Sequence, residues 1–317
     1  MISAEPADAA LENADFDSEE WEENRRVRAV ARHKARADKP TRPTMADETD
    51  EPADRDMTYQ PSRHERGWLL ESLAEFYDQG LISDVLASVK GGKEASVYRC
   101  QTAPAAREAV GAEFVAAKVY RPRQFRNLRN DALYREGRAT LTSEGTEVKR
   151  TDTRILRALG KKTAFGQQVA HTSWLMYEFT TLDNLYRAGA SVPKPIGASE
   201  NALLMGYVGS ADRAAPTLIE TTLAPSEAQF LFREVLRNLR VLLSLGRIHG
   251  DLSAYNILYW QGSITLIDFP QVVDRQGNPH AERIFTRDVT RVCEYFARQG
   301  VVCEAERVAA DLWRETE

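Results

Sequence analysis

The sequence predicts an α+β fold, with strands concentrated in its first half and helices dominating its last third. Short apolar segments separated by turn residues lie between residues 82 and 120, a pattern typical of strands. Apolar residues recur at helical spacing in residues 172–186, after Pro225, and around residues 281–298 and 303–315. The chain has 317 residues, 43% of them hydrophobic, so it can bury a full core and still carry extensions.

Residues 1–57 are predicted to form a disordered, charged extension. They are rich in Ala, Glu, Asp, Arg and Pro, with Phe16 and Trp21 as their only aromatic residues, so they can bury little apolar surface. Acidic residues 15–23 precede basic residues 25–39, a pattern typical of a solvated helix or of a segment that touches an acidic partner. We favour the solvated helix.

The folded domain, residues 58–317, is predicted to open near Glu65. Leu69, Leu73 and Phe76 lie at helical spacing there, which indicates an amphipathic helix.

Residues 88–98 predict two strands joined by a glycine turn. Glycines let backbone amides approach phosphates closely, but the full G-x-G-x-x-G spacing is absent, so this segment alone is more typical of an ordinary hairpin. Its position just before a lysine-bearing strand makes it a candidate nucleotide-binding turn. The candidate residues are Gly92, Lys93, Ser96 and Val97.

Residues 114–120 form an apolar strand pattern that contains one lysine, Lys118. Burying an unpaired ammonium is strongly unfavourable, so this side chain either reaches solvent or meets an anion. We expect an anion. Glu178 is the candidate partner, because it lies beside the apolar stripe of the helix predicted over residues 172–186, with Thr172 or Ser173 as its cap. The alternative is a solvated helix glutamate.

The polar stretch over residues 121–171 is too long for an ordinary connection and is therefore predicted to be a functional or flexible insertion. Residues 121–162 hold twelve Lys or Arg against five Asp or Glu, in a protein of net charge −5. This basic surplus fits a phosphate-binding surface for RNA or an acidic partner, and fits a solvated loop equally well. Aromatic residues are few, which does not favour base stacking.

The most specific pattern is Asp251, Asn256 and Asp268, which stand at the spacing that phosphoryl transfer requires. In such chemistry one carboxylate orients the attacking hydroxyl, and oxygen ligands hold Mg²⁺ against the phosphates. Magnesium keeps several waters, so one carboxylate and one amide from the protein suffice. Asp251 is the predicted base, and Asn256 and Asp268 are the predicted metal ligands. A hairpin of strands 257–260 and 264–267 is predicted to bring both ligands to one end.

These segments resemble the RIO family of atypical serine protein kinases, most closely its first subfamily. The resemblance rests on HGDLSAYN from His249, IDFPQ from Ile267 and GKEASVY from Gly92, together with Lys118 and the segment around Glu178. It covers about residues 60–300, and the two later motifs are specific when found together.

The resemblance implies a trimmed two-lobed protein-kinase-like fold that binds ATP and Mg²⁺. The N-lobe, residues 65–205, would combine a sheet with one long helix, and the C-lobe, residues 210–317, would be mostly helical. Lys118 would contact the α and β phosphates and pair with Glu178, Asp251 would be catalytic, and Asp268 would be both a metal ligand and an acceptor of phosphate in an ATPase cycle. Three further residues would line the adenine site: Met205, Gly206 and Val208.

Several departures from ordinary protein kinases are visible. Gly250 replaces the arginine before the catalytic aspartate, so control by a phosphorylated activation loop is not expected. Ser253 stands where a lysine commonly lies near the γ-phosphate, which removes one cation. Pro270 follows without an A-P-E sequence, which puts ordinary peptide docking in doubt.

The first choice is therefore a RIO-type serine/threonine protein kinase that phosphorylates a protein or itself, or that acts as an ATPase switch on a ribosomal or RNA–protein partner bound through residues 121–162. A small-molecule kinase of the aminoglycoside phosphotransferase or choline kinase type also uses HGD and an IDF-like strand, but Ser253, Tyr255 and Gln271 favour RIO. A nucleotide-binding scaffold without turnover is a third reading, and the intact set of polar site residues argues against it.

Cys100, Cys293 and Cys303 are widely spaced, so we expect buried or free thiols rather than disulfides or a zinc site. The chain has no run of eighteen apolar residues and no signal-like N-terminus, so a cytoplasmic protein without membrane contact is expected.

Overall fold

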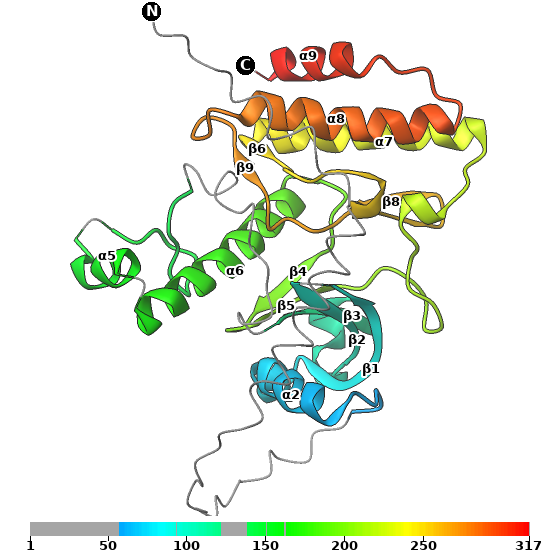
Figure 1. Ribbon diagram of the computed structural model, residues 1–317. Helices are drawn as coiled ribbons and strands as arrows, with labels where there is room; N and C mark the ends of the chain where they lie inside the picture. Colours follow the sequence, from blue (N-terminus) through cyan, green and yellow to red (C-terminus); the bar gives the residue numbers. More distant parts are fainter. Residues whose placement is uncertain (1–56, 93, 122–137, 150, 162, 317) are drawn as a thin grey trace, which may run out of the picture. The chain divides into compact units, whose positions relative to one another are not determined.

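The computed structural model describes residues 57–92, 94–121, 138–149, 151–161 and 163–316. The predicted N-terminal extension lies outside these residues except for Met57. Residues 122–137, which hold part of the predicted basic surplus, also lie outside them. The described part is α+β, as predicted, with an antiparallel sheet followed by helices (Figure 1).

The N-terminal sheet has five antiparallel strands in the order β1-β2-β3-β5-β4. The glycine-turn hairpin and the lysine strand are both confirmed, and Lys118 stands opposite Val97 on one side and Leu203 on the other. The strands are β1 (Ile82–Gly91), β2 (Ala95–Thr102), β3 (Phe114–Tyr120), β4 (Pro195–Ala198) and β5 (Ala202–Gly206), with the short η2 (Pro104–Ala106) and α3 (Arg107–Val110) before β3.

Helix α2 (Arg63–Asp78) covers this sheet. It begins where the Ser62 hydroxyl accepts a hydrogen bond from the Glu65 backbone N–H, a typical N-cap. Its buried Leu69, Leu73 and Phe76 join Val85 and Val115 in one apolar cluster, so the predicted amphipathic helix is confirmed.

The helix predicted over residues 172–186 is longer than expected. Helix α6 spans Ala164–Arg187 and is capped by Thr163, not by Thr172 or Ser173. Helix α5 (Thr153–Gly160) precedes it, inside the stretch expected to be an insertion. The two helices approach closely, since a Cβ on Gly166 would lie 2.0 Å from the carbonyl oxygen of Ala158.

The C-terminal part combines helices with two small two-stranded sheets. The helix predicted from Pro225, the hairpin and the two later helices are confirmed, and α8 contacts both α7 and α9 (Figure 1). The elements are η4 (Leu218–Glu220), α7 (Pro225–Ser244), β6 (Arg247–Ile248), η5 (Ala254–Asn256), β7 (Ile257–Trp260), β8 (Ser263–Leu266), β9 (Val273–Asp274), α8 (Ala281–Arg298) and α9 (Ala305–Glu315).

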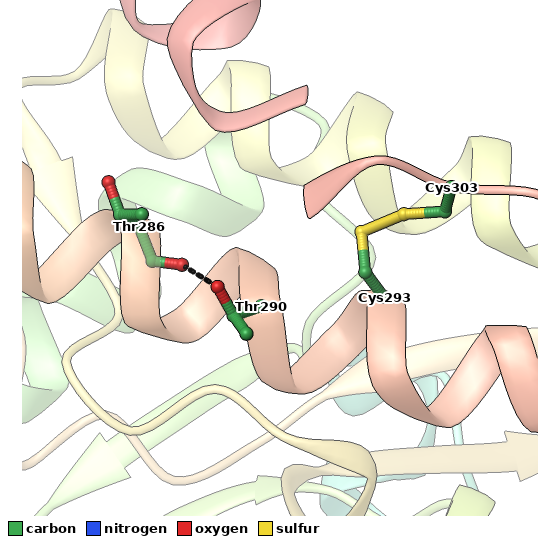
Figure 2. The surroundings of a disulfide bond; sticks show 4 residues. All are labelled: Thr286, Thr290, Cys293 and Cys303. Carbon is green, nitrogen blue, oxygen red and sulfur yellow. Dashed lines mark hydrogen bonds between the residues drawn. A yellow bond between two sulfur atoms is a disulfide. The ribbon is translucent and has the colours of Figure 1, made fainter. Parts of the chain in front are cut away.

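The expectation of three thiols is wrong for two cysteines. Cys293, on α8, and Cys303, just before α9, form a disulfide (Figure 2), whereas Cys100 is a buried free thiol. The chain turns back after α8 and brings the two Cα atoms to 5.9 Å, which is within disulfide range. Their spacing in the sequence does not reveal that turn. Among the described helices, none is long and apolar enough to cross a membrane.

Candidate active site

The loop that carries Asp251 is held in place by a glycine and a histidine. Gly250 has φ 84°, a left-handed conformation that favours glycine. A Cβ at this position would lie 2.1 Å from the carbonyl oxygen of Gln271. The His249 ring contacts Phe269, with centroids 5.0 Å apart, and its Nε2 lies 3.1 Å from the carbonyl oxygen of Ile267. Position 250 therefore needs a residue without a side chain.

Asp251 and Asn256 are in direct contact. Asn256 Nδ2 donates to the Asp251 backbone oxygen at 2.8 Å and to Oδ2 at 3.3 Å. This use of the amide nitrogen leaves the amide oxygen as the atom of Asn256 that can bind a cation.

Asp268 lies at the same end of the β7–β8 hairpin as Asn256, because the Ile267 N–H donates to the Asn256 carbonyl at 3.0 Å. Its φ is 72°, an uncommon conformation for a residue with a side chain and one that clusters at functional sites. Strand β8 has already ended at Leu266, and the Asp268 carboxylate contacts the lysine of the N-terminal sheet.

Lys118 bridges two carboxylates. Its Nζ lies 2.6 Å from Glu178 Oε1 on α6 and 2.6 Å from Asp268 Oδ1, so the lysine meets anions as predicted. The side chain of Lys118 is 11% exposed, that of Glu178 is 4% exposed and that of Asp268 is 43% exposed. Tyr120 also donates its hydroxyl to Glu178 Oε2.

The charges of this cluster are coupled. Burial alone would lower the pKa of Lys118, but the Asp268 and Glu178 carboxylates outweigh it and hold that pKa well above its usual range. Burial alone would raise the pKa of Asp268, yet the Lys118 ammonium holds it below its usual value. Burial raises the pKa of Tyr120. Lys118 therefore stays an ammonium and Asp268 a carboxylate at neutral pH.

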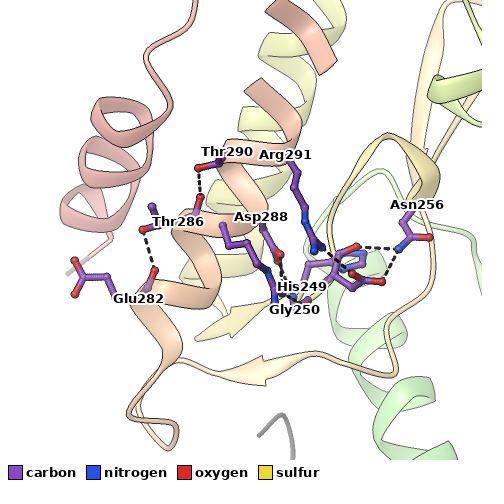
Figure 3. Close-up of polar contacts among 10 residues, drawn as sticks. His249, Gly250, Asn256, Glu282, Thr286, Asp288, Thr290 and Arg291 are labelled. Atoms are coloured by element: carbon purple, nitrogen blue, oxygen red, sulfur yellow. Dashed lines mark hydrogen bonds and ion pairs between the residues drawn. The ribbon is translucent and has the colours of Figure 1, made fainter. Parts of the chain in front are cut away.

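Three α8 residues reach the Asp251 loop and were missed by sequence reasoning. Figure 3 labels two of them, Asp288 and Arg291. Asp288 is fully buried and accepts the Gly250 N–H at 2.8 Å, and Arg287 donates to the Gly250 carbonyl. Arg291 Nη1 lies 2.9 Å from Asp251 Oδ1. Burial raises the pKa of Asp288. Asp288 lies on the apolar stripe of a helix, and such an acid is almost never buried unless it has a partner. Its position in the sequence was therefore the one indication that Asp288 makes a polar contact.

The nucleotide candidates of the N-terminal sheet are only partly described. Lys93 lies outside the described residues, Ser96 is 4% exposed, and a Cβ on Gly92 would lie 2.7 Å from the carbonyl oxygen of Ala95. Gly92 thus makes a close backbone turn between β1 and β2. Val97 pairs with Lys118, which sets this turn next to the lysine strand.

The adenine candidates lie at the end of β5 and just after it. Met205 pairs with Ala116 across the sheet. The Gly206 N–H donates to the Lys194 backbone carbonyl at 2.8 Å, and the Val208 carbonyl accepts from the Ala215 backbone N–H at 2.9 Å. These two backbone groups are therefore engaged within the protein.

The donor set fits magnesium. Asp268 offers a half-buried carboxylate and Asn256 an amide oxygen, both hard ligands. Among the described residues there is no group of three or more His, Cys, Asp or Glu that could hold a metal. A pair of oxygen ligands suits an ion that keeps waters and binds phosphates, rather than an ion enclosed by protein ligands.

A sheet lysine paired with a helix glutamate, followed by an aspartate–asparagine loop and an aspartate after the next hairpin, is typical of a protein-kinase-like fold. The profile of the RIO domain matches residues 133–309. The chain belongs to the RIO family, and its relatives indicate the Rio1 subfamily.

Curated relatives agree with this assignment. The chain is 33% identical to the RIO-type serine/threonine-protein kinase Rio1 of Haloferax volcanii over 223 residues, which cover 69% of this chain and 65% of the relative. It is 26% identical to the human serine/threonine-protein kinase RIO1 over 230 residues, 72% of this chain and 36% of the relative. The chain therefore spans less than two thirds of these relatives.

Proposed function

We propose that this protein is an ATP- and Mg²⁺-dependent serine/threonine protein kinase that phosphorylates a protein substrate or itself. The observation that carries the proposal is the cluster in which Lys118 contacts Glu178 and Asp268 while Asn256 contacts Asp251. The kinase names of the relatives support the same activity.

Each residue has a proposed role that its contacts support. Lys118, held by Glu178, would bind the α and β phosphates once the nucleotide displaces Asp268 from its ammonium. Asp268 and Asn256 would hold Mg²⁺, which neutralises charge on the phosphates when bound. Asp251 would accept a hydrogen bond from the acceptor hydroxyl and orient it for attack.

The nucleotide would lie against the N-terminal sheet. Gly92, Ser96 and Val97 would line the phosphate-binding turn, and Met205 would line the adenine site. Lys93 is proposed as a nucleotide-binding residue from the sequence alone. Because the Gly206 N–H and the Val208 carbonyl are engaged, adenine recognition would fall to the Gly206 carbonyl and the Val208 N–H. Single substitutions at these positions, each followed by a measurement of ATP affinity, test these assignments.

Turnover of γ-labelled ATP tests the function. The wild type should transfer label with Mg²⁺, and Asp251→Asn and Asp268→Asn should lose at least about 100-fold in rate. Asp311→Asn on α9, whose side chain is 47% exposed and pairs only with arginines of the same helix among the described residues, is the matched control and should retain full activity. Label on protein supports the kinase, and free phosphate alone supports an ATPase switch. Label on an aminoglycoside or choline, with none on protein, would refute the proposal.

We also propose that the basic face of α5 binds the phosphates of an RNA or ribosomal partner. Arg154, Arg157 and Lys161 line one depression of about 300 Å³ beside Thr153 and Thr163, and the arginines are exposed. In a fluorescence anisotropy titration with RNA, Arg154→Gln with Arg157→Gln should weaken binding and lower its salt dependence. An equal loss of RNA affinity in the α9 variant Arg307→Gln with Arg314→Gln would refute this proposal.

A cytoplasmic location is proposed because the activity consumes ATP. The Cys293–Cys303 disulfide is unusual for that compartment. Thiol alkylation of protein taken from cells, followed by mass spectrometry, measures how much of the pair is oxidised there.

A further inference from the structure

The Asp251 carboxylate is held from two sides. Arg291 Nη1 donates to its Oδ1 at 2.9 Å, and Asn256 Nδ2 donates to its Oδ2 at 3.3 Å. The two donors come from α8 and from η5, so the orientation of this carboxylate depends on a helix that lies 40 residues further along the chain. Figure 3 shows Arg291 and Asn256 reaching this loop from those separate elements.

Helix α8 is fixed against the same loop one turn earlier. The fully buried Asp288 accepts the Gly250 N–H, and Arg287 donates to the Gly250 carbonyl. Residues three apart lie on one helix face, so the anchoring of Asp288 sets the point from which Arg291 reaches Asp251.

The contact is not explained by fold stability. The side chains of Arg291 and Asp251 are 41% and 42% exposed, and ion pairs with this much exposure contribute little to folding. Chemistry at Asp251 is the more natural reason for a cation at this place.

The loop has no cation of its own. From Asp251 to Asn256 the sequence is DLSAYN, and Ser253 stands where protein kinases commonly carry a lysine beside the catalytic aspartate. A guanidinium presents five N–H donors in a planar fork, and the Asp251 contact uses Nη1.

We propose that Arg291 is a positioning residue for phosphoryl transfer: it supplies, from α8, a cation that the loop itself lacks, and it holds the Asp251 carboxylate in place for the acceptor hydroxyl. The inference rests on the proposed kinase function. A preset carboxylate lowers the cost of ordering the reacting groups, and a displacement of about 1 Å can cost about 100-fold in rate.

Steady-state kinetics of Arg291→Gln and Arg291→Lys test the inference. For Arg291→Gln we expect kcat to fall about 10- to 100-fold while KM for ATP changes by less than about threefold. Arg291→Lys should recover part of kcat. Arg283→Gln, an exposed arginine on the same helix, removes the same charge and should keep the wild-type kcat and thermal midpoint.

A double variant separates positioning from a general effect. If Arg291 acts through Asp251, Asp251→Asn with Arg291→Gln should be little slower than Asp251→Asn alone. Unchanged kcat in Arg291→Gln, a loss confined to KM, or multiplicative losses in the double variant would each overturn the inference while leaving the kinase proposal intact. Absence of turnover in the wild type would instead refute the proposed function itself.

Discussion

Replacing Lys118 by Met should destabilise the protein because it leaves two carboxylates without their shared cation. Glu178 has a side chain only 4% exposed, whereas that of Asp268 is 43% exposed and can be solvated. Removing one partner of a buried ion pair costs about 3–5 kcal/mol. The lower end applies here, since Tyr120 still donates to Glu178 and the half-exposed Asp268 can be solvated once its partner is lost.

A loss of about 3 kcal/mol corresponds to a fall in thermal midpoint of about 6–12 °C for a domain of this size. Circular dichroism during heating measures it. The matched variant is Lys118→Met with Glu178→Gln, in which no buried charge is stranded. It should be more stable than Lys118→Met alone by about 1–2 kcal/mol. A midpoint shift below about 2 °C, or a double variant less stable than the single one, would refute this account of the cluster.

Three further outcomes are expected. Gly250→Ala should cost at least about 3 kcal/mol in chemical denaturation, because its Cβ would overlap a backbone carbonyl at positive φ; Gly262→Ala, at φ 77° in open space, should cost only about 1–2 kcal/mol. Cys303→Ser should lower the free energy of unfolding by about 3 kcal/mol, the loop-closure entropy for a separation of 10 residues, and a reductant should lower that of the wild type equally but not that of the variant. The raised pKa of the buried Asp288 means that the folded state binds a proton more readily than the unfolded state, so wild-type stability relative to Asp288→Asn should rise as pH falls from 7 toward the usual aspartate value. A constant difference across that range would contradict the assigned cause.

The parts of the fold that the sequence predicted well are those in which local pattern and burial agree. The Lys118 strand is apolar on both sides of its lysine, and the hairpin after Asn256 has a turn of two residues at Gln261 and Gly262. In such segments the burial pattern of the final structure is already present in the order of residues.

The features that the sequence did not reveal depend on contacts between residues far apart in the chain. Helix α5 and the first two turns of α6 carry many polar residues, and which of their faces is buried depends on the contact between the two helices. The spacing of residues in the sequence does not reveal the close approach of the helices at Gly166. Arg291 and Asp288 contact a loop nearly 40 residues away, so no local motif contains them. The cysteine pair needed the turn between α8 and α9, which follows from tertiary packing.

Under the proposed function, the two carboxylates around Lys118 would also constrain the form in which the nucleotide binds. Ion pairs with Lys118 and Arg291 compensate Glu178, Asp268 and Asp251, and Lys90 adds a more distant favourable charge at Asp268. A free nucleoside triphosphate that took Lys118 from Asp268 would leave this carboxylate beside the phosphates, where like charges repel. A nucleotide that arrived with its divalent cation would bring the compensating charge with it, and Asp268 would exchange the Lys118 ammonium for that cation. We therefore expect the metal–nucleotide complex, rather than the free nucleotide, to be the form that binds.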